Sequence, residues 1–338
     1  MSIGIAGFPL SFARVFFAFL LFWSIGCNSA DASRLEIFLA VAGKDDNTGL
    51  SADSPVASFE KALAIARAKL DSKSEIAIHF APGNYGPRTL NLNWFPKNGR
   101  SLVLDGGGGA ARASFDGGNG DATWLVVRGQ RGQETHIVIR GFRVSNYRGA
   151  ISFYGNRFDN TPWSAKNIIE KNIFENIGQK RLGAKIGFSA ITLTNSVENT
   201  ISGNKFKDIT NLEKCDAIHA IYLSGGSSRN SIIDNVFDGG CGDTIKARDR
   251  SNHNVILNNK FYRQTGKAIF VDSFCDGKKV AECALKPQEC PSWGNVFRDN
   301  FIDDQSRRSM RTITRSTGRL HVESCPAPQG GRQQRILH

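Results

Sequence analysis

The sequence has no pair of cysteines at the C-x-x-C spacing that structural zinc sites use. It also contains only two methionines, and its apolar segment VFFAFLLFWSIG, at residues 15–26, is too short for a membrane-spanning helix. These absences argue against a structural zinc site and against a membrane span. Phenylalanine and glycine are abundant instead, at 23 and 35 residues, which favours many short strands joined by turns.

Residues 1–32 have the features of a secretory signal. Arg14 supplies a positive charge, the apolar segment follows it, and ADA at residues 30–32 offers small residues for cleavage. A lipid anchor at Cys27 is the alternative, although Ser24 stands where a leucine is usual in that motif. We therefore expect a secreted or periplasmic protein.

The net charge of +12 indicates an anionic partner. For an exported protein we expect acidic polysaccharide rather than nucleic acid, with simple colloidal solubility as the alternative. Part of the excess lies in residues 306–338, which contain seven arginines and one acidic residue, Glu323. Few residues there are apolar, so we expect a basic, loosely ordered tail.

An eight-residue pattern, N-x-I-x-x-N-x-F, recurs along the chain. It begins at residues 167, 199, 230 and 254, as NIIEKNIF, NTISGNKF, NSIIDNVF and NVILNNKF. A fifth copy, NVFRDNFI at residue 295, exchanges the two apolar types, and a weaker copy starts at His136. A second pattern of small residue, isoleucine, any residue and apolar residue begins between successive octads, at residues 150, 190, 220, 244 and 268.

Strands this short cannot bury an apolar face alone, so the repeats predict a solenoid of stacked coils. Each strand would pair with its equivalent one coil away, at about 4.8 Å, with isoleucines and phenylalanines stacked inside. The pattern places asparagines at coil corners, at residues 172, 204, 235, 259 and 300. We expect asparagine there because it tolerates left-handed backbone and because stacked amides form a hydrogen-bonded ladder.

These repeats resemble those of right-handed parallel β-helix proteins of the pectate-lyase-like superfamily. Residues 42–68 and 76–86 are similar to the N-terminal part of many such proteins, with a glycine- and aspartate-rich loop, a capping helix and a P-G-x-Y turn. Ser58 as N-cap and Glu60 in the first turn support a helix near residues 58–70 that covers the open end of the solenoid.

The resemblance implies an all-β fold, with one parallel β-helix domain over residues 33–305 and the tail after it. It predicts the fold rather than the activity, because this superfamily includes lyases, hydrolases, epimerases, esterases and adhesins.

Six cysteines remain once Cys27 is set aside with the signal, and an even number in an oxidising compartment predicts up to three disulfides. The longest interval between octads, 41 residues, suggests a loop inserted between coils. We expect Cys275, Cys283 and Cys290 to staple this loop, and Cys215 and Cys241 to bridge neighbouring coils. Cys325 is the sixth, and the connectivity is otherwise open.

The second pattern predicts which side chains face outward, because successive strand residues alternate between the two faces. With the isoleucines inside, one outward column reads Ser152, Thr192, Tyr222, Lys246 and Phe270. The next reads Tyr154, Thr194, Ser224, Arg248 and Asp272. The position two residues before the isoleucine holds Gly149, Ser189, His219, Asp243 and Lys267.

This face suits an anionic sugar chain. Tyr154, Tyr222 and Phe270 are expected to stack on sugar rings, and Lys246 and Arg248 to pair with a uronate carboxylate. In β-elimination a cation neutralises the carboxylate while a base removes the neighbouring proton. The candidate catalytic residues are therefore Lys246, Arg248, His219 and Tyr222.

Each candidate has a structural alternative. Lys246 is then a solvated surface lysine, Arg248 a partner of Asp243 or Asp249, and His219 a corner histidine. Substrate contacts are expected from Tyr154, Asp243, Arg250, Lys267, Phe270 and Asp272. Asp243 and Asp272 would alternatively form a hydrolase pair, a calcium site or coil-corner caps.

The resemblance also singles out Arg250. Lyases similar to chondroitinase B carry Lys-Ser before such an octad, and this chain has Arg250-Ser251 in RSNHNVILNNKF. The N-T-D, D-D and G-H-G motifs of polygalacturonase-like hydrolases and the D-P-H motif of alginate epimerases are absent at equivalent positions.

We therefore expect a monomeric protein that acts on uronate-containing polysaccharide, by β-elimination, without a cofactor. The alternatives are a non-catalytic binding protein and a C5 epimerase or glycoside hydrolase on the same scaffold. Calcium is a further alternative that no motif supports.

Overall fold

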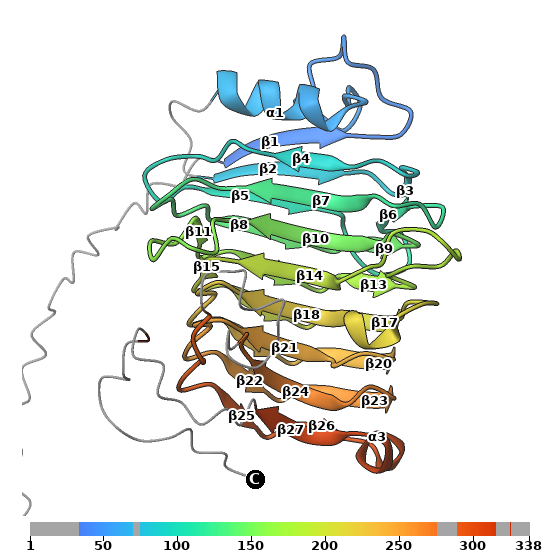
Figure 1. Cartoon of the computed structure of the whole chain (residues 1–338). Helices are drawn as coiled ribbons and strands as arrows, with labels where there is room; N and C mark the ends of the chain where they lie inside the picture. Colours follow the sequence, from blue (N-terminus) through green and yellow to red (C-terminus); the bar gives the residue numbers. More distant parts are fainter. Residues whose placement is uncertain (1–33, 70–74, 276–288, 316–324, 326–338) are drawn as a thin grey trace, which may run out of the picture. The chain divides into compact units, whose positions relative to one another are not determined.

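Three parallel β-sheets follow the stack of coils, and from β2 onward every coil contributes one strand to each sheet (Figure 1). The computed structural model describes residues 34–69, 75–275, 289–315 and 325. The expected signal at residues 1–32 lies outside this range. No helix among the described residues is long and apolar enough to cross a bilayer.

The sheets are named here in the order in which each coil visits them. Sheet A contains β1 (Arg34–Leu39), β2 (Glu75–Phe80), β5 (Ser101–Asp105), β8 (Ile137–Arg140), β12 (Ile168–Glu170), β16 (Thr200–Ser202), β19 (Ser231–Ile233), β22 (Val255–Leu257) and β25 (Val296–Arg298). Sheet B contains β3 (Gly83–Asn84), β6 (Ala113–Asp116), β9 (Arg143–Ser145), β13 (Ile173–Glu175), β17 (Lys205–Ile209), β20 (Val236–Gly240), β23 (Lys260–Gln264) and β26 (Phe301–Ile302).

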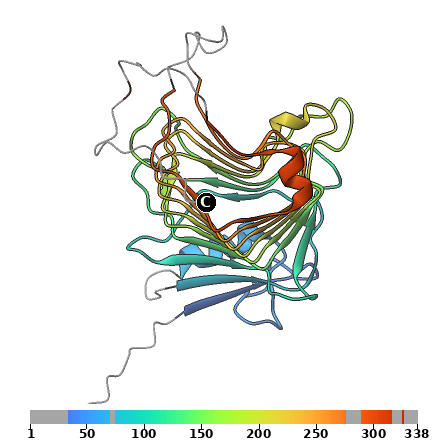
Figure 2. The ribbon, with the colours of Figure 1, turned by 90° about the horizontal axis from the view of Figure 1, so that it is seen from below.

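Sheet C carries the candidate site and contains β4 (Leu90–Leu92), β7 (Thr123–Arg128), β10 (Gly149–Tyr154), β14 (Ser189–Thr194), β18 (His219–Ser224), β21 (Ile245–Arg248), β24 (Ala268–Ser273) and β27 (Arg311–Arg315). A two-stranded sheet joins β11 (Ser164–Ala165) to β15 (Ser196–Val197). Seen along the stack, the strands of successive coils lie over one another (Figure 2). β27 extends sheet C to residue 315, beyond the boundary expected at residue 305.

The octads form sheets A and B, and their apolar residues stack inside as the repeat predicts. The second apolar position of each octad supplies a phenylalanine stack, in which Phe174, Phe206, Phe237 and Phe261 follow one another with ring centroids 5.2, 4.8 and 4.8 Å apart. The octad isoleucines stack in the same way under sheet A. Burying one such side chain contributes roughly 1.5–3 kcal/mol, so the interior stabilises every coil.

Two asparagine ladders bind successive coils together. One contains Asn167, Asn199, Asn230, Asn254 and Asn295, and the other Asn172, Asn204, Asn235, Asn259 and Asn300. In both ladders Nδ2 of each asparagine donates to Oδ1 of the next, at 2.7–3.1 Å. The same Oδ1 accepts the backbone N–H of the preceding asparagine, at 2.8–3.1 Å. The predicted amide ladder is therefore confirmed.

The left-handed backbone, in contrast, is not at these asparagines. The residue before each asparagine of the second ladder has the positive φ, namely Lys171, Gly203, Asp234, Asn258 and Asp299 with φ of 55–62°. The chain changes direction at the residue with positive φ, and the amide side chain of the asparagine that follows points into the interior. Asparagine is thus required for its hydrogen bonds and not for its tolerance of left-handed φ.

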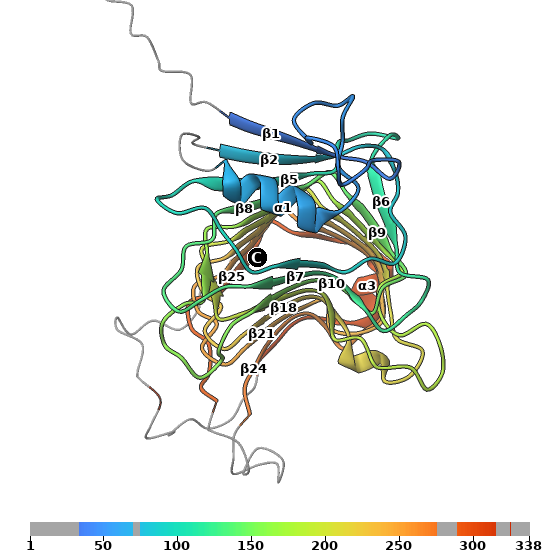
Figure 3. The same ribbon diagram turned by 90° about the horizontal axis from the view of Figure 1, so that it is seen from above.

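The capping helix is present as α1 (Phe59–Ala68), which lies across the first coils (Figure 3). Ser58 is its N-cap and accepts a hydrogen bond from the backbone N–H of Lys61 at 3.2 Å. The helix buries Phe59, Ala62, Leu63 and Ala66, and so covers apolar side chains that the first coil would otherwise expose. At the other end of the stack, the short helix α3 (Asp304–Ser309) follows β26.

Two disulfides are described. Cys215, in the 3-10 turn Cys215–Ala217, bonds to Cys241 in the equivalent turn of the next coil, as predicted. Cys275 is also disulfide-bonded, and Cys283 lies outside the described residues. Cys290 bonds to Cys325. Cys290 thus fixes the end of the inserted loop to the C-terminal segment, a connectivity that spacing cannot reveal.

The ladder leads to a stability prediction. Asn235→Ala leaves several buried donors and acceptors unpaired on both neighbouring coils, so the free energy of unfolding should fall by about 3 kcal/mol or more. The matched control is Asp234→Gly at the adjacent exposed corner, where φ is 56°. Glycine accepts this conformation, so the control should stay within about 1 kcal/mol of wild type. Equal losses in denaturant unfolding of the two variants would contradict the ladder's role.

Candidate active site

The outward face of sheet C is the surface on which the predicted site residues meet. The strand register aligns Ser152, Thr192, Tyr222 and Lys246 in one column. Ser224 and Arg248 are paired in the next column. The cationic and aromatic side chains therefore lie on adjacent strands about 4.8 Å apart.

The last coil departs from the predicted alignment by one residue. Phe270, not Ile269, pairs with Ile245, and Val271 pairs with Lys246. A slip of one residue moves every side chain to the opposite face. Phe270 is consequently in the core, 2% exposed, and its expected role as a sugar platform is wrong. Asp272 pairs with the inward residue Ala247 and is itself buried, so it does not join the outward column.

Lys246 is partly buried on β21, between Tyr222 and Val271. Its ammonium forms no hydrogen bond or ion pair within 4 Å among the residues that the structure describes. Burial lowers the pKa of Lys246, the charges of Arg248 and Lys267 lower it further, and Asp243 and Asp216 oppose the shift. Lys246 thus has a lowered pKa, and its ammonium has no partner among the described residues. Surface lysines rarely have both properties.

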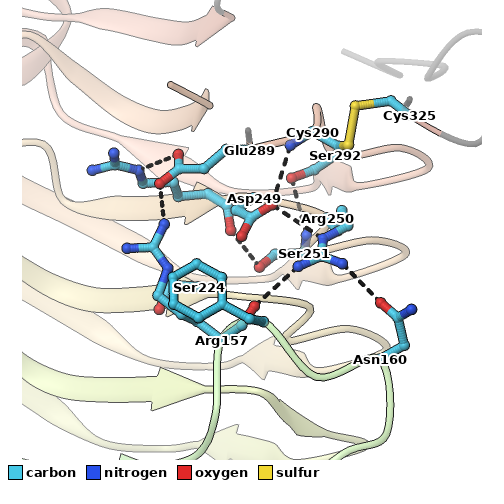
Figure 4. Close-up of polar contacts among 12 residues, drawn as sticks. Arg157, Asn160, Ser224, Asp249, Arg250, Ser251, Glu289, Cys290, Ser292 and Cys325 are labelled. Carbon is cyan, nitrogen blue, oxygen red and sulfur yellow. Dashed lines mark hydrogen bonds and ion pairs between the residues drawn. A yellow bond between two sulfur atoms is a disulfide. The ribbon is translucent and has the colours of Figure 1, made fainter. Parts of the chain in front are cut away.

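Arg248 is held by a carboxylate that the sequence did not reveal. Glu289, 2% exposed, accepts a hydrogen bond from Arg248 Nε at 2.6 Å and pairs with Arg157 on its other oxygen (Figure 4). It also accepts the backbone N–H of Cys275 at 2.8 Å. Burial by itself would raise the pKa of Glu289, but the bond from Arg248 and the charges of both arginines hold it below its usual range.

The segment that carries Glu289 is anchored to the coil beneath it. The backbone N–H of Cys290 donates to Asp249 Oδ1 at 3.1 Å, and Ser292 Oγ accepts the backbone N–H of Ser251 at 3.1 Å (Figure 4). The disulfide from Cys290 to Cys325 fixes the same point. These contacts join residues that are far apart in the sequence, and they hold Glu289 next to Arg248.

Arg250 has a structural role in this arrangement. Its Nε pairs with Asp249 at 3.1 Å, Nη1 donates to Asn160 Oδ1 at 2.8 Å, and Nη2 donates to the carbonyl oxygen of Arg157 at 2.9 Å (Figure 4). All three nitrogens thus bind within the chain and hold the loop between β10 and β11. The same loop packs against Gly225, where an added Cβ would lie 2.6 Å from the Cβ of Arg157.

His219 begins β18 and is 5% exposed. Its Nδ1 lies 2.8 Å from the carbonyl oxygen of Asp243, which only accepts hydrogen bonds, so Nδ1 carries the proton and Nε2 the lone pair. Burial, reinforced by the charge of Lys246, lowers the pKa of His219 to about 3. The imidazole is therefore neutral near pH 7 and has little affinity for a further proton.

Tyr222 links His219 to the cationic pair. Its ring stacks on the imidazole with centroids 5.5 Å apart, and its hydroxyl interacts with Arg248. Burial raises the pKa of this hydroxyl despite the charge of Arg248. Tyr222 therefore keeps its proton near pH 7 and is able to donate it.

The remaining predicted residues lie at the margins. Asp243 caps the corner, because its Oδ1 accepts the backbone N–H of Ala268 at 3.1 Å. Lys267 makes an exposed pair with Asp216, with 3.5 Å between Nζ and Oδ2. Tyr154 is 45% exposed on the outward face, with the guanidinium of Arg128 4.7 Å from its ring centroid. Within the described part of the chain, no group of three or more His, Cys, Asp or Glu residues could hold a metal ion.

Comparison with known proteins identifies the fold. The family model for "Right handed beta helix region" matches residues 126–286. An alginate lyase from Paenibacillus sp. is 12% identical, with 74% of this chain and 77% of that chain covered at a TM-score of 0.53. The pectate lyase Pel9A is 12% identical, with 88% and 82% covered at a TM-score of 0.50. No curated protein matches the sequence. The chain folds as a right-handed parallel β-helix, as the repeats predict.

The lowered pKa of His219 predicts acid sensitivity. Between its ordinary value of 6.5 and the folded value of about 3, the unfolded chain binds a proton that the folded chain does not. The stability that neutral His219 contributes is therefore complete above pH 6.5 and is lost as pH falls toward 3. His219→Gln should lose less stability than wild type over this range in denaturant unfolding. Protonation of His219 above about pH 5, seen by nitrogen NMR of the imidazole, would contradict its assignment as neutral.

Proposed function

We propose that the protein is an exported enzyme that cleaves uronate-containing polysaccharide by β-elimination on the outward face of sheet C. The observation that carries this proposal is Lys246, a desolvated lysine whose ammonium has no ion pair among the described residues and lies beside Arg248 on a rigid strand. The net charge of +12 supports an anionic substrate. Adjacent coils also repeat at about 4.8 Å, roughly the length of one sugar unit.

The reaction follows from the roles that these groups are able to take. Arg248 uses Nε for Glu289 and contacts the Tyr222 hydroxyl, and the remaining N–H groups of its two terminal nitrogens are available to pair with the uronate carboxylate. The neutral amine of Lys246 removes the proton at C5, beside that carboxylate. The electron pair forms the C4–C5 double bond, the C4–O4 bond breaks, and the departing oxygen takes the proton of Tyr222. The products are an unsaturated uronate and a new sugar end.

Lys246 is a better base than His219. A base whose conjugate acid has a pKa of about 3 binds a proton too weakly to take one from carbon near neutral pH. Neutral His219 instead supports the ring of Tyr222 and adds no positive charge beside Lys246. Glu289 is a positioning residue, because it fixes the direction of the Arg248 side chain without occupying the outward face.

A hydrolase has less support on this face. Hydrolysis of a glycoside normally uses two carboxylates that flank the bond. Asp243 is engaged at a coil corner, Asp272 is buried in the inward register, and Glu289 is enclosed by two arginines. An epimerase would share the base but yield no unsaturated product, so the assay below distinguishes it from a lyase.

The direct test is ultraviolet absorbance of unsaturated product when the purified protein meets alginate, pectate and glycosaminoglycans. Lys246→Ala should lower kcat roughly 10²–10⁴-fold with little change in KM, since it removes the base. Arg248→Lys keeps the charge but loses the forked contact, so kcat should fall and KM should rise. The matched control is Lys260→Ala, an exposed lysine of sheet B, which should behave as wild type. A kcat of Lys246→Ala equal to that of wild type, on the polysaccharide that wild type cleaves, would show that Lys246 is not the base.

The pH profile is a second prediction. Because the lowered pKa of Lys246 governs the amount of neutral amine, kcat/KM should rise with pH and be lost as pH falls through that pKa. The midpoint should lie below the usual lysine value of about 10.4. His219→Gln should retain the same midpoint, whatever its overall rate. If kcat/KM of His219→Gln no longer rises with pH, the titrating group is His219 and not Lys246.

A further inference from the structure

The outward face of sheet C continues beyond the cationic pair into a groove. It has a volume of about 200 Å³. It spans β7, β10, β14 and β18 and is lined by Thr123, Arg148, Gly149, Ser152, Tyr154, Phe188, Ser189, Thr192 and Tyr222. Tyr222 therefore belongs both to this groove and to the candidate active site, so the two are continuous.

Hydroxyl side chains contribute to the lining of the groove. Ser152 and Thr192 belong to the column that leads to Tyr222 and Lys246. Ser189 and Thr192 hydrogen-bond to each other through their hydroxyls. Hydroxyls both donate and accept, which suits the hydroxyl groups along the edge of a sugar ring.

Aromatic side chains stand at the two ends of these strands. Tyr154 ends β10 and is 45% exposed, and Phe188 directly precedes β14 and is 61% exposed. Phe188 is held in place, since its carbonyl oxygen accepts the backbone N–H of His219 at 2.9 Å. Exposed aromatics that line a groove together with a few hydroxyl groups are typical of a surface that stacks on a ligand.

From these observations we propose that the groove between Tyr154 and Phe188 is a subsite for one sugar ring of the polymer, away from the bond that is cleaved. The ring would contact the aromatic side chains and place its hydroxyls over Ser152 and Thr192. Ser152 and Thr192 lie two to three strand spacings of about 4.8 Å from Lys246, which is roughly two to three sugar units. The site thus requires a substrate long enough to fill both places. This proposal rests on the proposed function for the identity of the polymer.

The groove also explains what Arg128 and Arg148 do on this face. Arg128 lies over the ring of Tyr154, at 4.7 Å from its centroid, and Arg148 donates from Nε to the carbonyl oxygen of Asp121 at 2.8 Å. Both arginines are occupied by contacts that fix the rim. They still give the groove a positive potential, so an acidic ring is accepted there as well as a neutral one.

The test compares Tyr154→Ala, Phe188→Ala and the double variant with Leu212→Ala. Leu212 is a control because it is 59% exposed on a turn before β18 but does not line the groove. On long polymer, each aromatic variant should raise KM about threefold to tenfold, as expected for the loss of one ring contact. The kcat should stay within about twofold, because the cleaved bond lies elsewhere.

Oligosaccharides too short to reach the groove provide the second readout. Wild type and the double variant should cleave them with equal kcat/KM. An unchanged KM of the double variant on long polymer, with wild-type turnover, would overturn the subsite while leaving the lyase proposal intact. If no polymer is cleaved, affinity electrophoresis in the same panel of polysaccharides replaces the assay. Weaker retardation of the double variant alone then supports the subsite and rejects the lyase, whereas equal retardation, or none for any protein, rejects both.

Discussion

The hydrogen bonds between successive coils are the constraint on which the rest of this structure depends. Each coil is too short to fold alone, and many of its buried polar groups are paired by the coils before and after it. The asparagine ladders make this dependence specific, because one Oδ1 accepts both the backbone and the side-chain N–H of the preceding ladder member. The ladders therefore fix the register of sheets A and B, and through the closed coil they fix sheet C.

This register brings residues that are distant in the sequence together on the outward face of sheet C. Along the chain, one strand of sheet A and one strand of sheet B lie between Tyr222 and Lys246. Parallel pairing of β18 with β21 nevertheless places the two residues side by side. Lys246 is partly buried with no ion pair among the described residues. Desolvation that nearby carboxylates offset only in part destabilises the charged form of Lys246, which is the property that the proposed base needs.

The sequence was sufficient for most of what repeats, although it placed the left-handed backbone of the corners one residue too late. The octads predicted the stacked strands, the isoleucine and phenylalanine stacks and the amide ladder, and alternation predicted the outward positions of Tyr222, Lys246 and Arg248. It failed where the repeat is interrupted. In AIFV, residues 268–271, Phe270 rather than Ile269 takes the position that pairs with Ile245, although both side chains are buried.

Contacts that a single loop makes, outside the repeated pattern, could not be predicted from the repeat either. Glu289 meets Arg157 across 132 residues and Arg248 across 41, and no pattern joins these positions. The pairing of Cys290 with Cys325 is equally invisible in the spacing. A partial signal did exist for Glu289, since an acidic residue next to a cysteine in an inserted loop is a candidate for an anchored contact. Arg250 illustrates the converse, because its motif position suggested substrate while its three nitrogens bind the chain.

The central claim is that an acidic sugar chain lies on the outward face of sheet C with a carboxylate at Arg248. The most direct measurement is a crystal structure of Lys246→Ala with an acidic oligosaccharide from a polymer that the wild-type protein binds. The account predicts a chain that runs parallel to the stack of coils, with a uronate carboxylate on the terminal nitrogens of Arg248 and C5 facing the vacated position of residue 246. An oligosaccharide bound to sheet A or sheet B, or one that leaves Arg248 without a carboxylate, would contradict it.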